Sequence, residues 1–195
     1  RDAVCPQKIG DALQKLGDVT APKWHHRLLC AWCASNQSQP AHEVTRSDIL
    51  RACSEHEPSV DLVEVCGGAL SSVLGGSMDY AEVLFPRGSM DLVQPVYESA
   101  PHGRFYNSCV VGTISAIVAQ LRVGERLSVV EIGAGTGGTT ASVLPALQHA
   151  CSHYMFTDVS EVFLSRARRT FAQHDRFMRY ELLNIDADTR LQGFA

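Results

Sequence analysis

A glutamate followed by closely spaced glycines is the stretch of this chain whose residue types could do chemistry. Glu131 precedes Gly133, Gly135, Gly137 and Gly138, so four glycines fall within six residues. Glycine has no Cβ and adopts positive φ readily, which lets a backbone turn approach a ligand closely. Gly133, Gly135 and Gly138 fit the spacing G-x-G-x-x-G, which is typical of dinucleotide-binding turns. The stretch therefore predicts a site for a nucleotide-type cofactor.

The same residues also fit a second class of cofactor site. Glu131, Gly133, Gly135 and Gly137 read E-x-G-x-G-x-G, which resembles motif I of the class I S-adenosylmethionine (SAM) methyltransferases. An acid at the end of the strand would repel a pyrophosphate, whereas it could orient the cationic amino-acid end of SAM. Glu131 therefore favours SAM, although the glycine spacing alone leaves a nicotinamide or flavin cofactor open.

A strand and a helix must hold the glycine turn in place. Residues 127–132 form a short, largely β-branched apolar run, which is typical of a buried parallel strand. The segment TTASVLPALQHA after the glycines indicates a helix, whose N-terminus adds partial positive charge at the turn. Strand, turn and helix together predict an α/β, Rossmann-like unit.

An acid ends each of the next two predicted strands. Residues 153–158 end at Asp158, which follows Gly138 by 20 residues, where an acid that binds ribose hydroxyls is expected. Residues 178–184 alternate as in a strand, and Asp186 beyond its tip could accept a hydrogen bond from an adenine amino group. The alternative for both acids is a solvated position in a loop, because loop acids are common.

Longer strings resemble the methyltransferase domains embedded in polyketide synthases. The similarity is carried by EIGAGTGGTTASVLPAL, FTDVS, FMRYELLNIDAD and QGFA, and upstream by GGALSSVLGGSMDYAEVLFPRGSMDLVQPVYESAPHGRFYNSCV. It implies a class I Rossmann-like core preceded by a helical lid, with SAM as cofactor. An acyl carrier protein bearing the acyl substrate, and neighbouring synthase domains, are the implied partners. The resemblance also implies cofactor contacts from Ala134, Thr136 and Val159.

The strand pattern divides the chain. No strand pattern precedes residue 127. The sequence therefore predicts an all-helical lid over residues 1–100 and the N-terminal part of a SAM-binding core over residues 101–195. Tyr106 lies near the start of the helix before the first strand, so its ring could pack against the sulfonium methyl group or inside the lid. Only the first three strands of such a core are predicted, and an apolar first strand is rarely left at a sheet edge. We therefore expect the rest of the sheet either beyond Ala195 or from another segment. The resemblance implies that the catalytic base lies beyond Ala195, so no catalytic residue is assigned.

Composition argues against other classes of protein. The net charge of −4 gives no indication of a nucleic-acid partner. No apolar run approaches the ~20 residues that cross a membrane, and no signal peptide is indicated. Seven scattered cysteines indicate reduced thiols and hence a cytoplasmic protein. Cys30 and Cys33 have zinc-type spacing but lack a second ligand pair, so we expect helix packing and no metal site.

The leading prediction is a SAM-dependent methyltransferase that methylates the α-carbon of a carrier-bound β-ketoacyl chain. That carbon lies between a thioester and a ketone, so a positioned His or Glu could remove its proton. O-methylation and a non-catalytic pseudo-methyltransferase scaffold stay open as alternatives. A nicotinamide- or flavin-binding oxidoreductase is the remote alternative.

Overall fold

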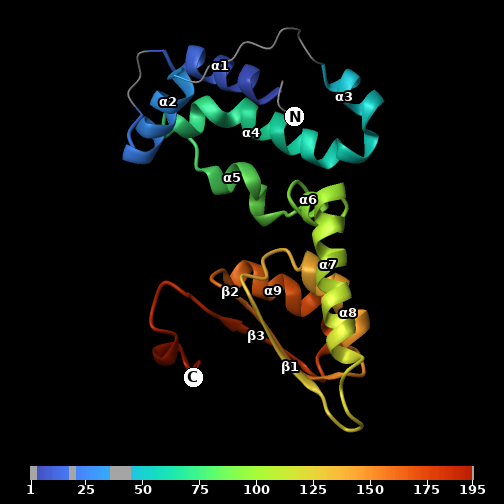
Figure 1. Ribbon diagram of the computed structural model, residues 1–195. Coiled ribbons are helices and arrows are strands. Elements are labelled where there is room, and N and C mark those ends of the chain that lie inside the picture. The colour runs from blue at the N-terminus through green and yellow to red at the C-terminus, as the bar shows by residue number, and fades with distance from the viewer. Residues whose placement is uncertain (1–3, 18–20, 36–44, 195) are drawn as a thin grey trace. The chain divides into compact units, whose positions relative to one another are not determined.

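The chain divides into two compact units, Arg1–Pro101 and His102–Ala195 (Figure 1). The computed structural model describes residues 4–17, 21–35 and 45–194. Each unit is considered separately. In the first unit every regular element in the described ranges is helical, namely α1 (Val4–Leu16), α2 (Trp24–Ser35), α3 (Arg46–Ala52), α4 (Glu57–Leu74), α5 (Tyr80–Leu84) and α6 (Gln94–Glu98), with 3-10 turns at Ser54–His56 and Pro86–Gly88.

Helix α3 is held by side chains at its start. Thr45 and Asp48 form the reciprocal pair of hydrogen bonds called a capping box, which satisfies N–H groups that have no partner inside the helix. Arg46 donates to Glu64 of α4 at 2.8 Å and also pairs with Asp61 of that helix. Arg46 also pairs with Glu57 at the start of α4, at 3.1 Å, so one guanidinium facing three carboxylates joins α3 to α4.

Apolar packing of the long helix α4 organises the rest of this unit. Helices α1 and α2 both contact α4, and Leu74 near its end is almost completely buried. Helix α2 differs, because Trp24, Leu28 and Trp32 are all more than half exposed. Cys30 is half-buried, and the side chain of Cys33 lies outside the described residues.

The second unit is a parallel α/β layer. Its sheet has the strand order β1-β2-β3, with every pair parallel, as expected when helices connect successive strands. The helix before the first strand begins at Pro101, five residues before Tyr106, because proline suits the first turn of a helix. The elements are α7 (Pro101–Val118), β1 (Leu127–Ile132), α8 (Gly138–Leu147), β2 (Cys151–Asp158), α9 (Glu161–Thr170) and β3 (Met178–Leu182), with 3-10 turns at Ala172–His174 and Thr189–Gln192.

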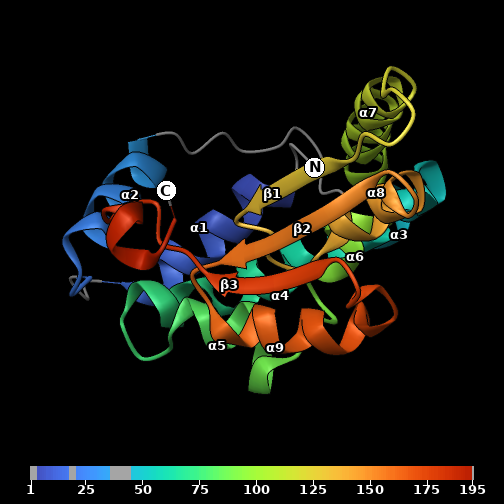
Figure 2. The same ribbon diagram turned by 90° about the horizontal axis from the view of Figure 1, so that it is seen from below.

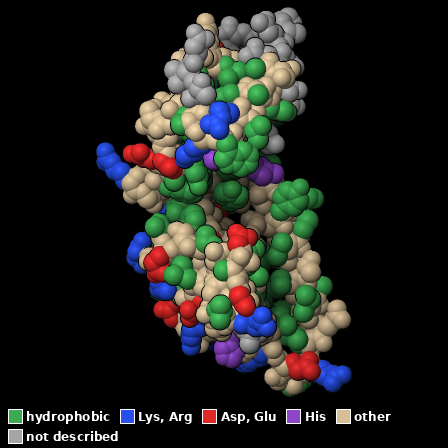
Figure 3. Space-filling view, turned by 90° about the vertical axis from the view of Figure 1, so that its left-hand side faces the viewer, with side chains coloured by type: hydrophobic (Ala, Val, Ile, Leu, Met, Phe, Trp, Pro, Cys, Tyr) green, Lys and Arg blue, Asp and Glu red, His purple; other side chains and the backbone are tan. Residues whose placement is uncertain are grey.

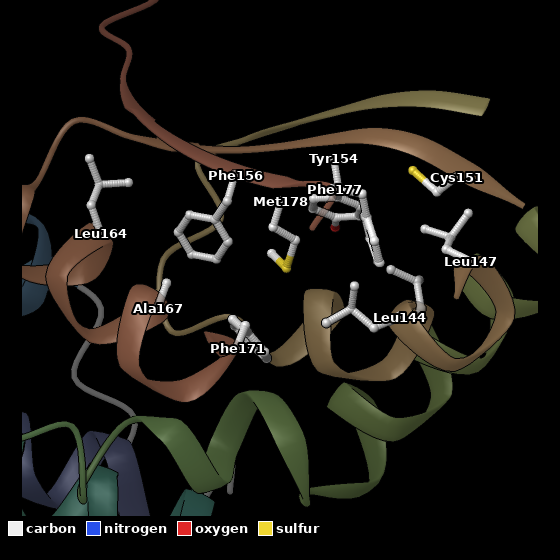
Figure 4. Packing of buried hydrophobic residues seen from close by; sticks show 11 residues of the cluster. Leu144, Leu147, Cys151, Tyr154, Phe156, Leu164, Ala167, Phe171, Phe177 and Met178 are labelled. Atoms are coloured by element: carbon white, nitrogen blue, oxygen red, sulfur yellow. The ribbon is translucent and has the colours of Figure 1, made fainter. Parts of the chain in front are cut away.

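Helices α8 and α9 lie on one face of the sheet, and the core fills the space between them and the strands (Figure 4). Tyr154 and Phe156 project from β2 into this layer and are fully buried. Leu147 of α8 and Leu164 of α9 meet them from the helices. Burial of each such side chain stabilises the folded state by roughly 1.5–3 kcal/mol, so this layer holds the three strand ends in fixed register.

The other face of β1 is uncovered among the described residues. Val130 and Ile132 alternate with half-buried neighbours along the strand and are each more than half exposed. In the described residues β1 pairs with β2 alone, and Figure 2 shows β1 and β3 at the two edges of the sheet. Additional strands beside β1 stay a prediction.

Candidate cofactor site

The turn between β1 and α8 requires glycine for two different reasons. Gly133, Gly135 and Gly137 have φ values of 68°, 56° and 80°, in the region that side chains rarely adopt. A Cβ on Gly137 would also lie 2.9 Å from the Phe171 ring, whereas a Cβ on Gly133 would meet nothing within 4 Å. Packing against the core therefore adds to the backbone requirement at Gly137.

Three backbone donors of the turn have partners inside the protein. The N–H of Ala134 donates to the carbonyl of Thr157 at 2.9 Å, and the N–H of Gly137 donates to the carbonyl of Ala134 at 3.0 Å. The N–H of Gly135 donates to the carboxylate of Asp158 at 2.9 Å. The turn is thus attached to the end of β2 at two points.

Asp158 is the last residue of β2 and is only 6% exposed. One carboxylate oxygen accepts the N–H of Gly135, and the other accepts the N–H of Ser160 at 2.9 Å. Ser160 is the N-cap of α9, so this carboxylate joins the glycine turn to the start of the next helix. Asp158 is thus a buried, doubly hydrogen-bonded acid at the end of β2 rather than a solvated loop acid.

Glu131 points into the helix-covered layer. One of its carboxylate oxygens accepts a hydrogen bond from the Thr140 hydroxyl and another from the Tyr154 hydroxyl, the Tyr154 bond being 2.6 Å long. Its backbone carbonyl accepts from the hydroxyl of Thr157 at 2.7 Å. Burial raises the pKa of the Glu131 carboxyl, while its two hydroxyl partners act in the opposite direction.

Four residues, two in the first turn of α8 and one each on α7 and β2, have roles that sequence reasoning missed. The Thr139 hydroxyl donates to the Asn107 side chain of α7 at 2.9 Å, and Asn107 is buried. Thr140 and Tyr154 together enclose the Glu131 carboxyl. A tyrosine inside an apolar strand is a signal that could have found the second contact, because a buried phenol needs a hydrogen-bond partner.

The other predicted site residues are more open. Tyr106 on α7 is 67% exposed, and Val159 after β2 is also exposed. Asp186 beyond β3 is exposed, and its N–H donates to the side chain of Asn184 at 2.9 Å. Among the described residues no hydrogen bond joins Tyr106 or Asp186 to the glycine turn. Hydrogen bonds therefore join Asp158 to the glycine turn and Glu131 to Thr140 just after it. Within the described ranges, Tyr106 and Asp186 make no such contact with the turn.

The described residues show neither a metal-binding cluster nor a membrane-spanning helix. They contain no group of three or more His, Cys, Asp or Glu side chains placed to hold a metal ion. None of the described helices is long and apolar enough to cross a membrane. Basic and acidic side chains are interspersed on the face drawn in Figure 3.

A parallel sheet with a glycine turn after its first strand and an acid at the end of its second defines a class I, Rossmann-like cofactor domain. Comparisons with known proteins give the family. Residues 130–194 match the family described as a methyltransferase domain. The present structure is similar to the crystal structure of the CurJ carbon methyltransferase, with a TM-score of 0.83 and 26% sequence identity. The match covers 98% of the present chain and 60% of the CurJ chain.

The sequence relatives are synthases. Polyketide synthase PksR of Bacillus subtilis (strain 168) is 34% identical over 133 residues, or 65% of this chain. Polyketide synthase ThaQ of Burkholderia thailandensis is 36% identical over 153 residues, or 75% of this chain. The chain spans only 5% and 7% of the length of these two relatives. The chain thus contains a match to a methyltransferase domain and is similar to polyketide synthases, and both the resemblance and the class I fold predicted from the sequence are confirmed.

Proposed function

We propose that this chain binds SAM and forms the cofactor-binding part of a C-methyltransferase. The observation that carries the choice of cofactor is the 2.9 Å hydrogen bond from the Gly135 N–H to the Asp158 carboxylate. In a dinucleotide-binding turn, backbone donors at the start of the helix face the pyrophosphate. Here a carboxylate occupies such a donor and would repel a phosphate placed beside it. The turn is therefore better suited to a ligand without phosphate.

SAM has the chemistry that this turn can accept. It carries ribose hydroxyls, a sulfonium and an α-ammonium group, and no phosphate. An ionised carboxylate offers about four lone-pair positions, and Asp158 uses two of them for backbone N–H groups. Positions that remain on Asp158 can accept the ribose hydroxyls.

We assign the other residues by the same chemistry. Residues 133–137, Ala134 and Thr136 included, would face the amino-acid and sulfonium end of SAM. Val159 would contact the ribose and adenine, and Asp186 would accept from the adenine amino group. Tyr106 would pack its ring against the sulfonium methyl group, a contact favoured for a cation over an aromatic face. The Glu131 carboxylate would orient the cationic amino-acid end of SAM.

The proposed reaction is methylation of the α-carbon of a β-ketoacyl chain carried by an acyl carrier protein. Its support is the likeness to the CurJ carbon methyltransferase and to much longer polyketide synthases. A base would remove the α-proton, and the resulting carbanion would take the methyl group in line with the C–S bond, while S-adenosylhomocysteine would leave as a neutral thioether with the electron pair of that bond. SAM supplies the activated methyl group, so the protein must mainly align the two reactants and exclude water. We place the base outside the 195 residues and assign none within them.

We also propose that the helical unit serves as the lid that receives the acyl chain. Its α2 exposes Trp24, Leu28 and Trp32, a surface suited to an apolar chain rather than to a charged ligand. In the intact protein, deleting residues 1–100 should abolish methylation of a carrier-bound chain and weaken SAM binding less. Full activity on the carrier-bound chain after the deletion would contradict the role of the lid.

An isotope experiment tests the reaction. The intact protein is incubated with SAM that carries a deuterated methyl group and with a β-ketoacyl chain on a carrier protein. We expect mass spectrometry to show one deuterated methyl group on the acyl chain, and NMR of the released product to place it on the α-carbon. Label on the oxygen would contradict carbon methylation. Transfer to a free small acceptor in preference to the carrier-bound chain would contradict the proposed substrate.

A further inference from the structure

Two adjacent threonines in the first turn of α8 bond to different parts of the protein. The Thr139 hydroxyl donates to the Asn107 side chain of α7 at 2.9 Å. The Thr140 hydroxyl donates to the carboxylate of Glu131 on β1. Both threonines directly follow Gly138, so the helix turn that they hold continues the glycine turn of the proposed cofactor site.

The Thr140 side of this arrangement is completely buried. Thr140 is 0% exposed and Tyr154 is 2% exposed, and both hydroxyls donate to the same oxygen of Glu131. Loss of either hydroxyl would remove one of the two donors of the Glu131 carboxylate. Because water reaches this carboxylate poorly, the lost hydrogen bond would not be replaced and the fold would be destabilised. This contact attaches α8 to β1 and β2.

The Thr139 side attaches the same turn to α7. Asn107 is 9% exposed and lies directly after Tyr106 on that helix. Val111 and Ile114, further along α7, pack against the core of the unit. The hydrogen bond therefore fixes the first turn of α8 against a helix that is itself held by apolar packing.

The glycine turn needs such support. Three of its residues have positive φ, and glycine retains more backbone freedom than any other residue. If a turn becomes ordered only when its ligand binds, the entropy lost in ordering it lowers the affinity for the ligand. A turn that is already ordered avoids this cost. Hydrogen bonds on both sides of the first helical turn restrict the conformations that the glycines can reach.

We propose that Asn107 and Tyr154 are positioning residues for the cofactor turn, Asn107 acting through Thr139, and Tyr154 acting through the Glu131 carboxyl and Thr140. Neither needs to touch the cofactor. The inference rests on the proposed function, because the turn is taken to bind SAM. It adds residues of α7 and β2 to a site that the glycine pattern alone confines to the turn itself.

The test compares Thr139→Val with Thr139→Ser in the intact protein. Valine keeps the shape of threonine but removes the donor, and serine restores it. For Thr139→Val we expect SAM affinity to fall by about tenfold, the loss of one partly buried hydrogen bond. We expect kcat at saturating SAM and the thermal unfolding temperature to stay close to those of the unaltered protein, and Thr139→Ser to recover the affinity.

Thr113→Val is the matched control. Thr113 lies on α7, is exposed, and donates only to the carbonyl of Cys109 within its own helix, at 3.0 Å. The same chemical change there should leave SAM affinity within about twofold of the unaltered protein. An equal loss of affinity at Thr113 and Thr139 would overturn the proposal, since the effect would then not be specific to the turn.

A double-mutant cycle isolates the contact with α7. If Asn107 acts through Thr139, Thr139→Val should cost little further affinity in an Asn107→Leu background. Tyr154→Phe should weaken SAM binding in the same direction, with Glu131 left in place. Unchanged affinity in Thr139→Val and Tyr154→Phe, in a protein that does bind SAM, would overturn this inference alone. Failure of the unaltered protein to bind SAM would overturn the proposed function and this inference with it.

Discussion

The ends of β1 and β2 differ from the end of β3 in how their polar groups are held. Glu131 and Asp158 lie in or near the core, and each carboxylate accepts two hydrogen bonds from other elements of the protein. Asp186, beyond β3, is exposed, and its backbone is bonded only to Asn184 two residues away.

The difference separates a preformed part of the site from an open part. The acids of the first region are positioned before any ligand arrives, so their substitution should affect both folding and binding. The acid of the second region lies in a local turn, where substitution should affect binding alone.

Gly137→Ala should be the most damaging single change in the first region. It combines backbone strain at φ 80° with a Cβ only 2.9 Å from the Phe171 ring. Strain and overpacking together should lower the free energy of unfolding by about 2–5 kcal/mol. Gly133→Ala is the matched control, since it has the strain without the contact. A urea titration that ranks Gly133→Ala as equally destabilising would contradict the packing argument.

Asp158→Ala should weaken SAM binding more than any other acid substitution. It removes the acceptor for Gly135 and Ser160 together with the proposed ribose contacts. A loss of roughly 1.5–3 kcal/mol is expected, or about tenfold to a hundredfold in affinity. Titration calorimetry measures it, and an unchanged dissociation constant would remove Asp158 from the site.

Glu131→Gln should change how stability depends on pH. Burial raises the pKa of Glu131, so the folded protein holds this proton more tightly than the unfolded chain does. The contribution of Glu131 is therefore most favourable at low pH and is lost as the pH rises from about 4.3 through the folded pKa. Glutamine keeps a hydrogen-bond acceptor and does not titrate.

Urea unfolding of both proteins across this pH range is the measurement. Relative to Glu131→Gln, the unaltered protein should lose free energy of unfolding as the pH rises. Parallel curves would show that the Glu131 carboxyl is not desolvated by its surroundings.

Asp186→Ala should have the smallest effect. One exposed hydrogen bond to the adenine amino group accounts for about 0.5–1.5 kcal/mol, and folding should not change. Comparison with Asp158→Ala in the same calorimetric series tests the contrast between the regions directly. A larger loss for Asp186→Ala than for Asp158→Ala would reverse it.

Local patterns predict much of this molecule. The three strands and the glycine turn follow from residue types within a few positions of one another. The resemblance of longer strings predicts the family, which the comparisons confirm.

The contacts that build the site are beyond such patterns. Gly135 and Asp158 are 23 residues apart, as are Glu131 and Tyr154, and Thr139 and Asn107 are 32 apart. Parallel register and helix packing bring these pairs together, and neither leaves a local signal in a single sequence. For the same reason the sequence assigns Asp158 to the ligand but does not show that it also supports the turn.

Titration calorimetry of the intact protein with SAM and with NAD tests the central claim most directly. A turn whose Gly135 donor is occupied by Asp158 should bind SAM saturably and give no heat with NAD. Saturable binding of NAD without binding of SAM would show that the turn accepts a pyrophosphate, and would contradict the account.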